Sequence, residues 1–164
     1  MGAGRQRRIA LEQGRIGLIS DTHGLLRPEA LAALRGVELI VHAGDIGKPE
    51  VLECLQAIAP LAAIKGNNDT APWARHIPEA LDLLLNHTGV RVIHNVHDLE
   101  NKLPAAGVQV VISGHSHKPS IVRRDNVLFV NPGSAGPRRF RLPVTVGLLF
   151  LQNADAQAEI IHLL

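Results

Sequence analysis

Four short, mainly apolar runs constrain the fold of this chain more than any other feature of its sequence. They cover residues 16–20, 39–42, 61–64 and 108–113, and in each the apolar side chains are continuous rather than alternating. Continuous runs of about four to eight residues are typical of strands covered on both faces, as parallel strands are when crossover helices pack over them. We therefore predict an α/β fold around a buried sheet.

The segments between the first three runs have helical patterns. Residues 27–36 place Pro28 in the first turn of a helix and Gly36 at its C-terminal stop. Residues 48–60 place these apolar side chains on one helical face: Val51, Cys54, Leu55 and Ile58. The N-terminal half is thus predicted to run strand, helix, strand, helix, strand, with Cys54 buried as a small hydrophobic residue of the core.

The second half of the chain is richer in strand patterns. Apolar stretches at 81–85 and 90–96 flank the turn-like residues 86–89 and predict a hairpin. Further β-rich pieces follow at 121–123, 127–130, 144–151 and 158–162. The last two of these flank the polar residues 152–155 and predict a second hairpin.

Length and composition narrow the classes of function. The 164 residues suit one domain, which we place at 15–164 after a flexible N-terminal tail at 1–14. The tail lacks the apolar stretch of about 7–15 residues of a signal peptide, and no run approaches the ~20 apolar residues of a membrane span. The lone cysteine cannot form an intrachain disulfide, so we expect a cytoplasmic protein without membrane contact. A net charge of +2 and few aromatic residues argue against nucleic acid as a binding partner.

Side chains that can bind metal ions follow the predicted buried strands. They are Asp21, His23, Asp45, Asn67, Asn68, Asp69, His97, His115 and His117. Each motif alone suits an ordinary turn, but loops at the carboxyl ends of strands are where α/β proteins assemble their sites. Carboxylate, imidazole and amide groups suit divalent Mn, Fe, Zn, Ni or Co, and the absence of clustered cysteines argues against a thiolate site.

The order of these motifs, Asp-x-His, Gly-Asp, Gly-Asn-x-Asp, His and Gly-His-x-His, resembles the calcineurin-like metallophosphoesterase superfamily nearly from end to end. The run Asn131-Pro132-Gly133-Ser134 after a late strand makes the chain more similar to the small members often called YfcE-like phosphodiesterases. The resemblance implies a four-layer αββα sandwich of two mixed sheets flanked by helices. It also implies two divalent metal ions, with manganese as our first choice and Fe, Ni, Zn or Co as alternatives.

The resemblance further implies a ligand set. One ion would be held by Asp21, His23 and His117, the other by Asn67, His115 and a histidine of the fourth segment, with Asp45 as the bridge. Two cations about 3.5–4 Å apart need an anionic bridge, clamp a pair of phosphate oxygens and lower the pKa of a shared water. The expected reaction is hydrolysis of a phosphoester by in-line attack of the bridging hydroxide.

The fourth segment offers two histidines, His94 and His97. We favour His97, because the other expected ligands follow completed apolar runs and His97 follows Val96, whereas His94 interrupts the strand predicted there. The run His97-Asp98-Leu99 also resembles a subset of the family. Loss of the metals in His94→Ala but not in His97→Ala would reverse this choice.

Many members of the superfamily have a histidine after the Gly-Asn pair that assists the leaving group, and this chain has Asn68 there. Asn68 is no useful proton donor, but its amide can hydrogen-bond a phosphoryl oxygen. The expected catalytic residues are therefore Asp45, Asn67 and Asn68, with small phosphoesters as substrates and good leaving groups preferred. A phosphodiesterase is our first hypothesis, and a non-catalytic metal-binding scaffold or protein-interaction module on the same fold is the alternative. The natural substrate, the diester or monoester preference and assembly into a homo-oligomer stay open.

Other polar and aromatic residues receive structural interpretations. The remaining histidines complete no ligand set: His42, His76, His87 and His162. Trp73 is interpreted as packing against a loop. The cationic segment 137–141 and Lys118 are interpreted as solvated, with contact to a phosphate group as the alternative.

Overall fold

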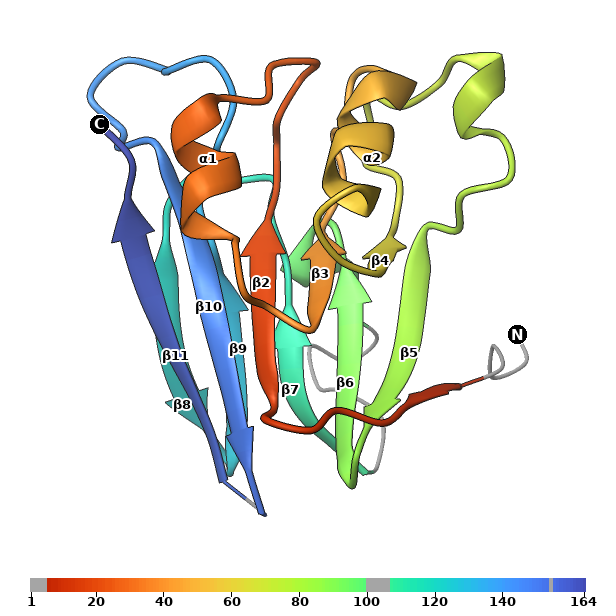
Figure 1. Cartoon of the computed structure of the whole chain (residues 1–164), viewed down its shortest axis with the longest axis vertical. Helices are drawn as coiled ribbons and strands as arrows, with labels where there is room; N and C mark the ends of the chain where they lie inside the picture. The colour runs from red at the N-terminus through yellow and green to blue at the C-terminus, as the bar shows by residue number, and fades with distance from the viewer. Residues whose placement is uncertain (1–5, 100–106, 154) are drawn as a thin grey trace.

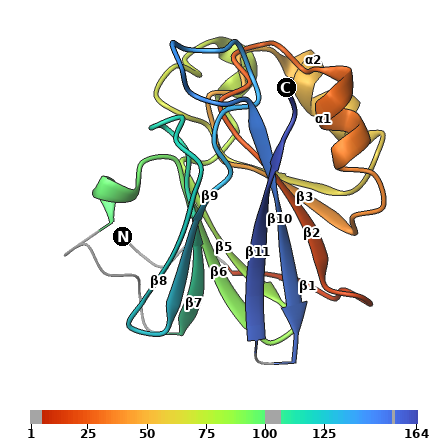
Figure 2. The same ribbon diagram turned by 90° about the vertical axis from the view of Figure 1, so that its left-hand side faces the viewer.

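Two β-sheets packed face to face form the body of the computed structural model, which describes residues 6–99, 107–153 and 155–164. Both α-helices lie on the outer face of one sheet (Figures 1 and 2). This arrangement confirms the α/β class and the sandwich of two mixed sheets. None of the helices in these ranges has the length and apolarity that crossing a bilayer requires.

The five-stranded sheet has the strand order β11-β10-β2-β3-β4. Its strands are β2 (Arg15–Ile19), β3 (Leu39–His42), β4 (Leu61–Ala63), β10 (Thr145–Gln152) and β11 (Asp155–His162). The first three run parallel, with α1 (Pro28–Ala33) and α2 (Pro49–Gln56) as crossovers, and β10 and β11 form an antiparallel hairpin. The predicted strand-helix-strand-helix-strand half and the second hairpin are both confirmed.

The helix α2 corrects one expectation, because Cys54 is exposed rather than buried. Val51 and Leu55 are the buried residues of this helix and join the cluster between the sheet and the helices. Cys54 lies roughly 80° around the helix axis from their midpoint, at the edge of the face that the sheet covers. The buried stripe is narrower than the apolar pattern predicted.

The six-stranded sheet has the order β1-β5-β6-β7-β9-β8. Its strands are β1 (Arg7–Ile9), β5 (Ala80–Leu85), β6 (Thr88–Ile93), β7 (Val108–Ile112), β8 (Ser120–Arg124) and β9 (Val127–Asn131). The predicted hairpin of β5 and β6 is confirmed, with Asn86 and His87 alone between the two strands. β6, β7 and β9 run parallel to one another.

The segment predicted as a flexible tail contains an edge strand. β1 pairs in parallel with β5, and the N–H groups of Glu12 and Gln13 donate to the carboxylate of Glu38. These and further backbone N–H donors outweigh desolvation and lower the pKa of Glu38. The tail expectation is therefore wrong for residues 7–13, and residues 1–5 lie outside the described ranges. A three-residue strand with one apolar side chain, Ile9, leaves no periodic signal to read.

The main core lies between the two sheets and is aliphatic, as the scarcity of aromatic residues predicts. It includes Ile16, Leu18, Leu39, Val41, Leu83, Leu85, Val90, Val92, Val110 and Ile112. A second cluster joins the five-stranded sheet to the helices and includes Trp73 of the 3-10 turn η1 (Pro72–Ala74), as interpreted from the sequence. The outer face of the other sheet carries a small cluster around Leu99 and Val111, beside the 3-10 turn η2 (Val96–Asp98). In the described ranges, η2 is the one helical turn against that face.

Candidate metal centre

The carboxyl ends of β2, β3, β4, β6 and β7 meet at one edge of the sandwich (Figure 1). The five-stranded sheet brings Asp21 and Asp45 to this edge, and the six-stranded sheet brings His94 and His117. The site is thus assembled from both sheets, at the place where the sequence predicts convergence.

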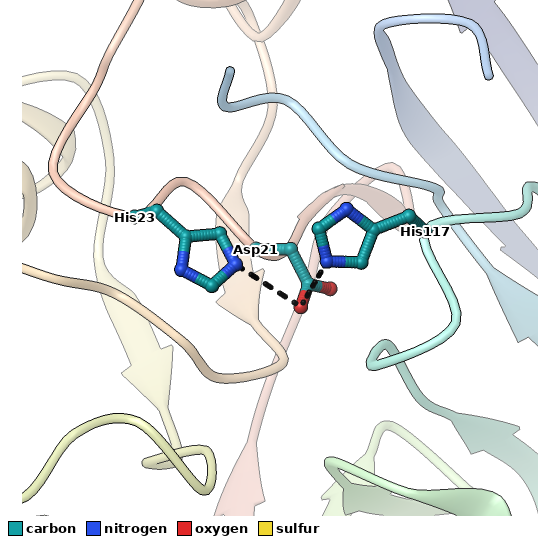
Figure 3. Close-up of side chains that lie close together, drawn as sticks. All are labelled: Asp21, His23 and His117. Carbon is teal, nitrogen blue, oxygen red and sulfur yellow. Dashed lines mark ion pairs between the residues drawn. The ribbon is translucent and has the colours of Figure 1, made fainter. Parts of the chain in front are cut away.

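One group of ligand atoms surrounds Asp21 (Figure 3). Its Oδ1 lies 3.9 Å from Nε2 of His23 and 3.5 Å from Nε2 of His117, and the two imidazole rings are stacked with centroids 5.4 Å apart. Asp21 and His117 are buried and His23 is partly so. One carboxylate and two imidazoles therefore face a common point.

A second group contains Asp21, Asp45 and His94, all of them buried. Nε2 of His94 lies 3.3 Å from Oδ2 of Asp45 and 3.9 Å from Oδ1 of Asp21. Oδ2 of Asp45 also lies 3.8 Å from Nε2 of His23. The two groups are therefore contiguous, and Asp45 reaches imidazoles of both.

Unpartnered buried atoms test whether these residues fit a metal ion. Asp21 Oδ1, His23 Nε2 and His94 Nε2 are buried and have no hydrogen-bond partner. A buried polar atom without a partner costs on the order of 1–3 kcal/mol, more when it is charged. These three atoms converge on the same space, so divalent cations there would satisfy them together. The donor set of carboxylate and imidazole fits such ions.

Hydrogen bonds fix the orientation of both carboxylates. Oδ2 of Asp21 accepts from the Ser20 hydroxyl at 2.7 Å and the His115 N–H at 3.1 Å, which leaves Oδ1 directed at the site. The Asn68 N–H donates to Oδ1 of Asp45 at 2.9 Å, and its Nδ2 donates to Oδ2 at 3.2 Å. Burial acts to raise the pKa of Asp45, but the His94 ring beside it, the N–H bond from Asn68 and the charge of the nearby imidazoles outweigh it and lower the pKa to about 2.

His94 is held in the form that a metal ligand needs. Its Nδ1 lies 2.7 Å from the carbonyl oxygen of Ala43, to which it donates when protonated. The neutral ring then carries its proton on Nδ1, so the lone pair of Nε2 faces the two carboxylates. Burial acts to lower the pKa of His94, but the neighbouring Asp45 carboxylate, the Ala43 carbonyl and the charge of Asp21 outweigh it and raise the pKa.

His42 and Asp69 hold the loops after β3 and β4 in place through hydrogen bonds to their backbone. The Gly44 N–H donates to Nδ1 of His42 at 3.1 Å, so Nε2 carries the proton toward the Thr22 hydroxyl, 3.0 Å away. Complete burial lowers the pKa of His42 to about 4 and keeps it neutral. Asp69 accepts N–H bonds from Ile46 and Gly66 on one carboxylate oxygen and from Gly47 on the other.

Left-handed backbone conformations concentrate at the site. Five candidate ligands have positive φ: Asp21 (54°), His23 (46°), Asp45 (57°), His115 (73°) and His117 (64°). Such conformations cost roughly 1–3 kcal/mol each in residues with a Cβ and persist where surrounding contacts enforce them. A Cβ on Gly114 would lie 2.6 Å from Oδ2 of Asp21, so this position has no room for a side chain.

The structure separates the two histidines of the fourth segment. β6 ends at Ile93, so His94 is the first residue after the strand, and it is the one grouped with Asp45. His97 is exposed on η2 and lies outside both ligand groups. The sequence argument placed the strand end at Val96, three residues too late. A two-residue turn between strands of equal length would have ended the strand at Ile93.

The remaining sequence candidates lie around this centre. Asn67 and His115 line a cavity of about 500 Å³ together with His94, and the ring of His115 is 5.2 Å from that of His94. Asn68 is exposed, and its backbone N–H and side-chain amide both donate to Asp45. The structure thus groups Asp21, His23, Asp45 and His117 with His94, and it places Asn67 and His115 in the lining of the adjoining cavity.

Comparison with known proteins gives the family. The sequence profile of the calcineurin-like phosphoesterase superfamily domain matches residues 15–154, and the chain belongs to this superfamily. A probable metallophosphoesterase of Methanothermobacter thermautotrophicus is 36% identical, over 90% of this chain and 91% of the relative. Phosphodiesterase MJ0936 of Methanocaldococcus jannaschii is 29% identical, over 86% of this chain and 95% of the relative.

Solved structures agree on the fold. A structure described as a novel archaeal phosphodiesterase superposes with a TM-score of 0.74 at 25% identity, over 90% of this chain and 99% of the other. Vps29 of Chaetomium thermophilum superposes with a TM-score of 0.73 at 17% identity, over 90% and 96% of the two chains. At that identity the likeness to Vps29 concerns the fold alone.

Proposed function

We propose that this chain is a divalent-metal-dependent phosphodiesterase with a dinuclear centre. One ion is assigned to Asp21, His23 and His117, the other to Asn67, His94 and His115, with Asp45 between them. His94 replaces His97 of the sequence hypothesis. The observation that carries the proposal is the convergence of unpartnered, buried carboxylate and imidazole atoms from both sheets.

Bound divalent cations supply Lewis-acid activation of water and neutralise charge on phosphoryl oxygens. The chain keeps Asp45 ionised through the neighbouring His94 ring, 3.3 Å away, and the hydrogen bond from Asn68. The second amide hydrogen of Asn68 is available for a phosphoryl oxygen of the substrate. No imidazole follows Asn67, so a substrate whose leaving group departs as a stable anion suits this site best.

The cavity beside His94 gives room for one ester arm. Its lining includes Lys65, Arg91, Glu79 and Asp98. Arg91 is paired with Asp82 at 2.9 Å, whereas Lys65, Glu79 and Asp98 have no ion-pair partner among the described residues. The cavity thus carries charges of both signs, so a polar arm is favoured in it, and the phosphorus would lie between it and His117.

Metal content and turnover test the proposal together. We expect the purified protein to hold two Mn, Ni or comparable ions per chain and to hydrolyse bis(p-nitrophenyl) phosphate faster than p-nitrophenyl phosphate. Asp45→Asn should lose one ion and reduce kcat by at least about 100-fold, since even outer partners of metal ligands are worth about 10–100-fold. Asp155→Asn, on the exposed β10–β11 turn, is the matched control and should change neither quantity.

Two outcomes would contradict the proposal. Metal binding with no turnover of either ester would leave a non-catalytic scaffold as the better description. Faster hydrolysis of the monoester would assign the site to monoesters. The metal series Mn, Ni and Mg in the same assay identifies the ion that supports activity.

A further inference from the structure

Phe140 is the most exposed large apolar side chain of the described residues, with 96% of its surface accessible. Its backbone is left-handed, with φ of 52°. The Leu142 N–H donates to the Arg139 carbonyl at 3.0 Å, so Phe140 occupies the first central position of a tight turn. Glycine is the usual residue where that position has positive φ. An aromatic residue here has both backbone strain and an uncovered ring, and packing against the described part of the chain does not offset them.

The turn is attached to the loop that carries Asp21. The Ser134 hydroxyl donates to the Asp21 carbonyl at 3.0 Å, and the Ala135 N–H donates to the Ser20 carbonyl at 3.1 Å. Gly136 continues this contact, because a Cβ there would meet the carbonyl oxygens of Asp21 and Thr22. Four residues of chain span at most about 14 Å, so Phe140 is held within that reach of Gly136 and therefore stays near the loop that carries Asp21.

The neighbours of Phe140 are cationic. Arg138, Arg139 and Arg141 are exposed, and none of them has an ion-pair partner among the described residues. The turn therefore presents an aromatic face and unpaired positive charge beside a site for a phosphate group.

We propose that Phe140 is a specificity residue whose ring stacks on a planar aromatic group of the substrate, while Arg139 attracts the phosphate. The proposal rests on the proposed function and narrows its substrate class to phosphodiesters that carry a nucleobase or an aryl group. Every nucleobase has a π-face, so stacking on one exposed ring tolerates many bases.

The stacking platform proposed here, the exposed ring of Phe140, is tested by ligand binding to the Mn-loaded full-length protein, a measurement that does not depend on turnover. Calorimetry compares thymidine 5′-monophosphate and phenyl phosphate, which carry a ring, with methyl phosphate, which does not. Phe140→Ala should weaken binding of the two ring-bearing ligands by roughly 5- to 100-fold, the range typical of base–aromatic stacking, and should leave methyl phosphate unchanged. Weaker binding of thymidine monophosphate alone would identify a nucleobase as the group recognised.

Further variants of Phe140 separate the effect of its aromatic ring on ligand binding from the effect of its backbone conformation on folding. Phe140→Gly suits the left-handed backbone and should lose the same ligand affinity while folding normally, and Phe140→Trp should retain affinity. Ile121→Ala, which removes an exposed apolar side chain from β8, should change nothing. Unchanged binding of both ring-bearing ligands by Phe140→Ala would overturn the platform alone. Failure of the wild-type protein to bind methyl phosphate would overturn the proposed function and the platform with it.

Discussion

Asp69 shows how one side chain positions a site that it does not enter. Its carboxylate accepts N–H bonds from Ile46, Gly47 and Gly66, at 2.9 to 3.0 Å, and so fixes the loop of Asp45 against the loop of Asn67. Hydrogen bonds to a charged group contribute about 1.5–3 kcal/mol each. Asp69 therefore acts on the metal centre through the backbone of two loops.

We expect Asp69→Asn to lower the free energy of unfolding by about 2–3 kcal/mol, because the amide nitrogen cannot accept the bonds that the lost oxygen accepted. Metal affinity should fall as well, since the loops of Asp45 and Asn67 lose their common anchor. Urea denaturation and metal titration measure the two effects. Asp125→Asn on an exposed turn is the control, and equal stability of both variants would contradict the prediction.

His94 and His97 differ in environment although only two residues separate them. His94→Ala should remove one ion from the centre and reduce diester hydrolysis by at least about 100-fold, because it takes a ligand from beside Asp45. His97→Ala should keep both ions and full activity, since its side chain is exposed on η2. Mass spectrometry of bound metal and steady-state kinetics decide between them, and loss of metal in His97→Ala would restore the sequence hypothesis.

Most of the candidate site could be predicted from sequence because its residues directly follow apolar strands. Asp21, Asp45 and His117 come from such motifs, and the structure brings them together. His94 could not be chosen correctly, because Val96 extends the apolar pattern beyond the true strand end. The hydrogen bond from His94 to the Ala43 carbonyl joins segments 51 residues apart and leaves no local trace.

At the scale of the element, α2 shows that a residue of an apolar helical pattern need not be buried. Leu55 is fully buried between the helix and the five-stranded sheet, whereas its neighbour Cys54 is exposed. The pattern predicted both as core residues. Their different positions therefore give a sharp mutational contrast within one turn of helix.

Leu55→Ala should lower the free energy of unfolding by about 2–5 kcal/mol, the cost of truncating a buried leucine. Cys54→Ser should stay within about 0.5 kcal/mol of wild type, as exposed substitutions do. Chemical denaturation measures both. Alkylation of Cys54 in the native protein by a small thiol reagent should proceed readily, and protection of this thiol until unfolding would contradict its exposure.

The inner strands and the hairpins could be predicted from the sequence more completely than the edge strand β1 and the placement of the helices. The parallel strands and both hairpins follow from continuous apolar runs and polar turns. β1 could not be predicted, because its pairing with Leu83–Leu85 depends on the tertiary position of β5 rather than on local periodicity. The assignment of the two α-helices to one sheet also depends on packing between distant elements.

At the scale of the whole molecule, His42 couples folding to pH. Its pKa is about 4 in the folded protein against an ordinary value of 6.5, so the unfolded chain binds the proton more readily. The contribution of His42 to the free energy of unfolding is therefore fully present above about pH 6.5, falls as the pH drops toward 4 and changes no further below that. The loss over this window is about 3 kcal/mol, since each pKa unit corresponds to about 1.4 kcal/mol.

Replacement of His42 by Asn should flatten the pH dependence of unfolding between pH 4 and 6.5, because Asn cannot bind a proton. Metal-free wild-type protein and His42→Asn are compared by urea denaturation across this range, so that contributions from the other histidines cancel in the difference. NMR titration of the His42 ring checks its pKa directly. Parallel pH profiles for the two proteins would rule out His42 as the source.

The origin of the ligands in both sheets has a mechanical consequence. Asp21 and Asp45 follow strands of the five-stranded sheet, and His94 and His117 follow strands of the six-stranded sheet. A cation bound by these ligands would link the two sheets at this edge of the sandwich. The opposite edge, where the hairpin of β10 and β11 turns, could separate without breaking that link (Figure 2). Local opening should therefore begin at the hairpin edge and reach the metal centre last, and amide hydrogen exchange should become progressively slower from the first edge to the second.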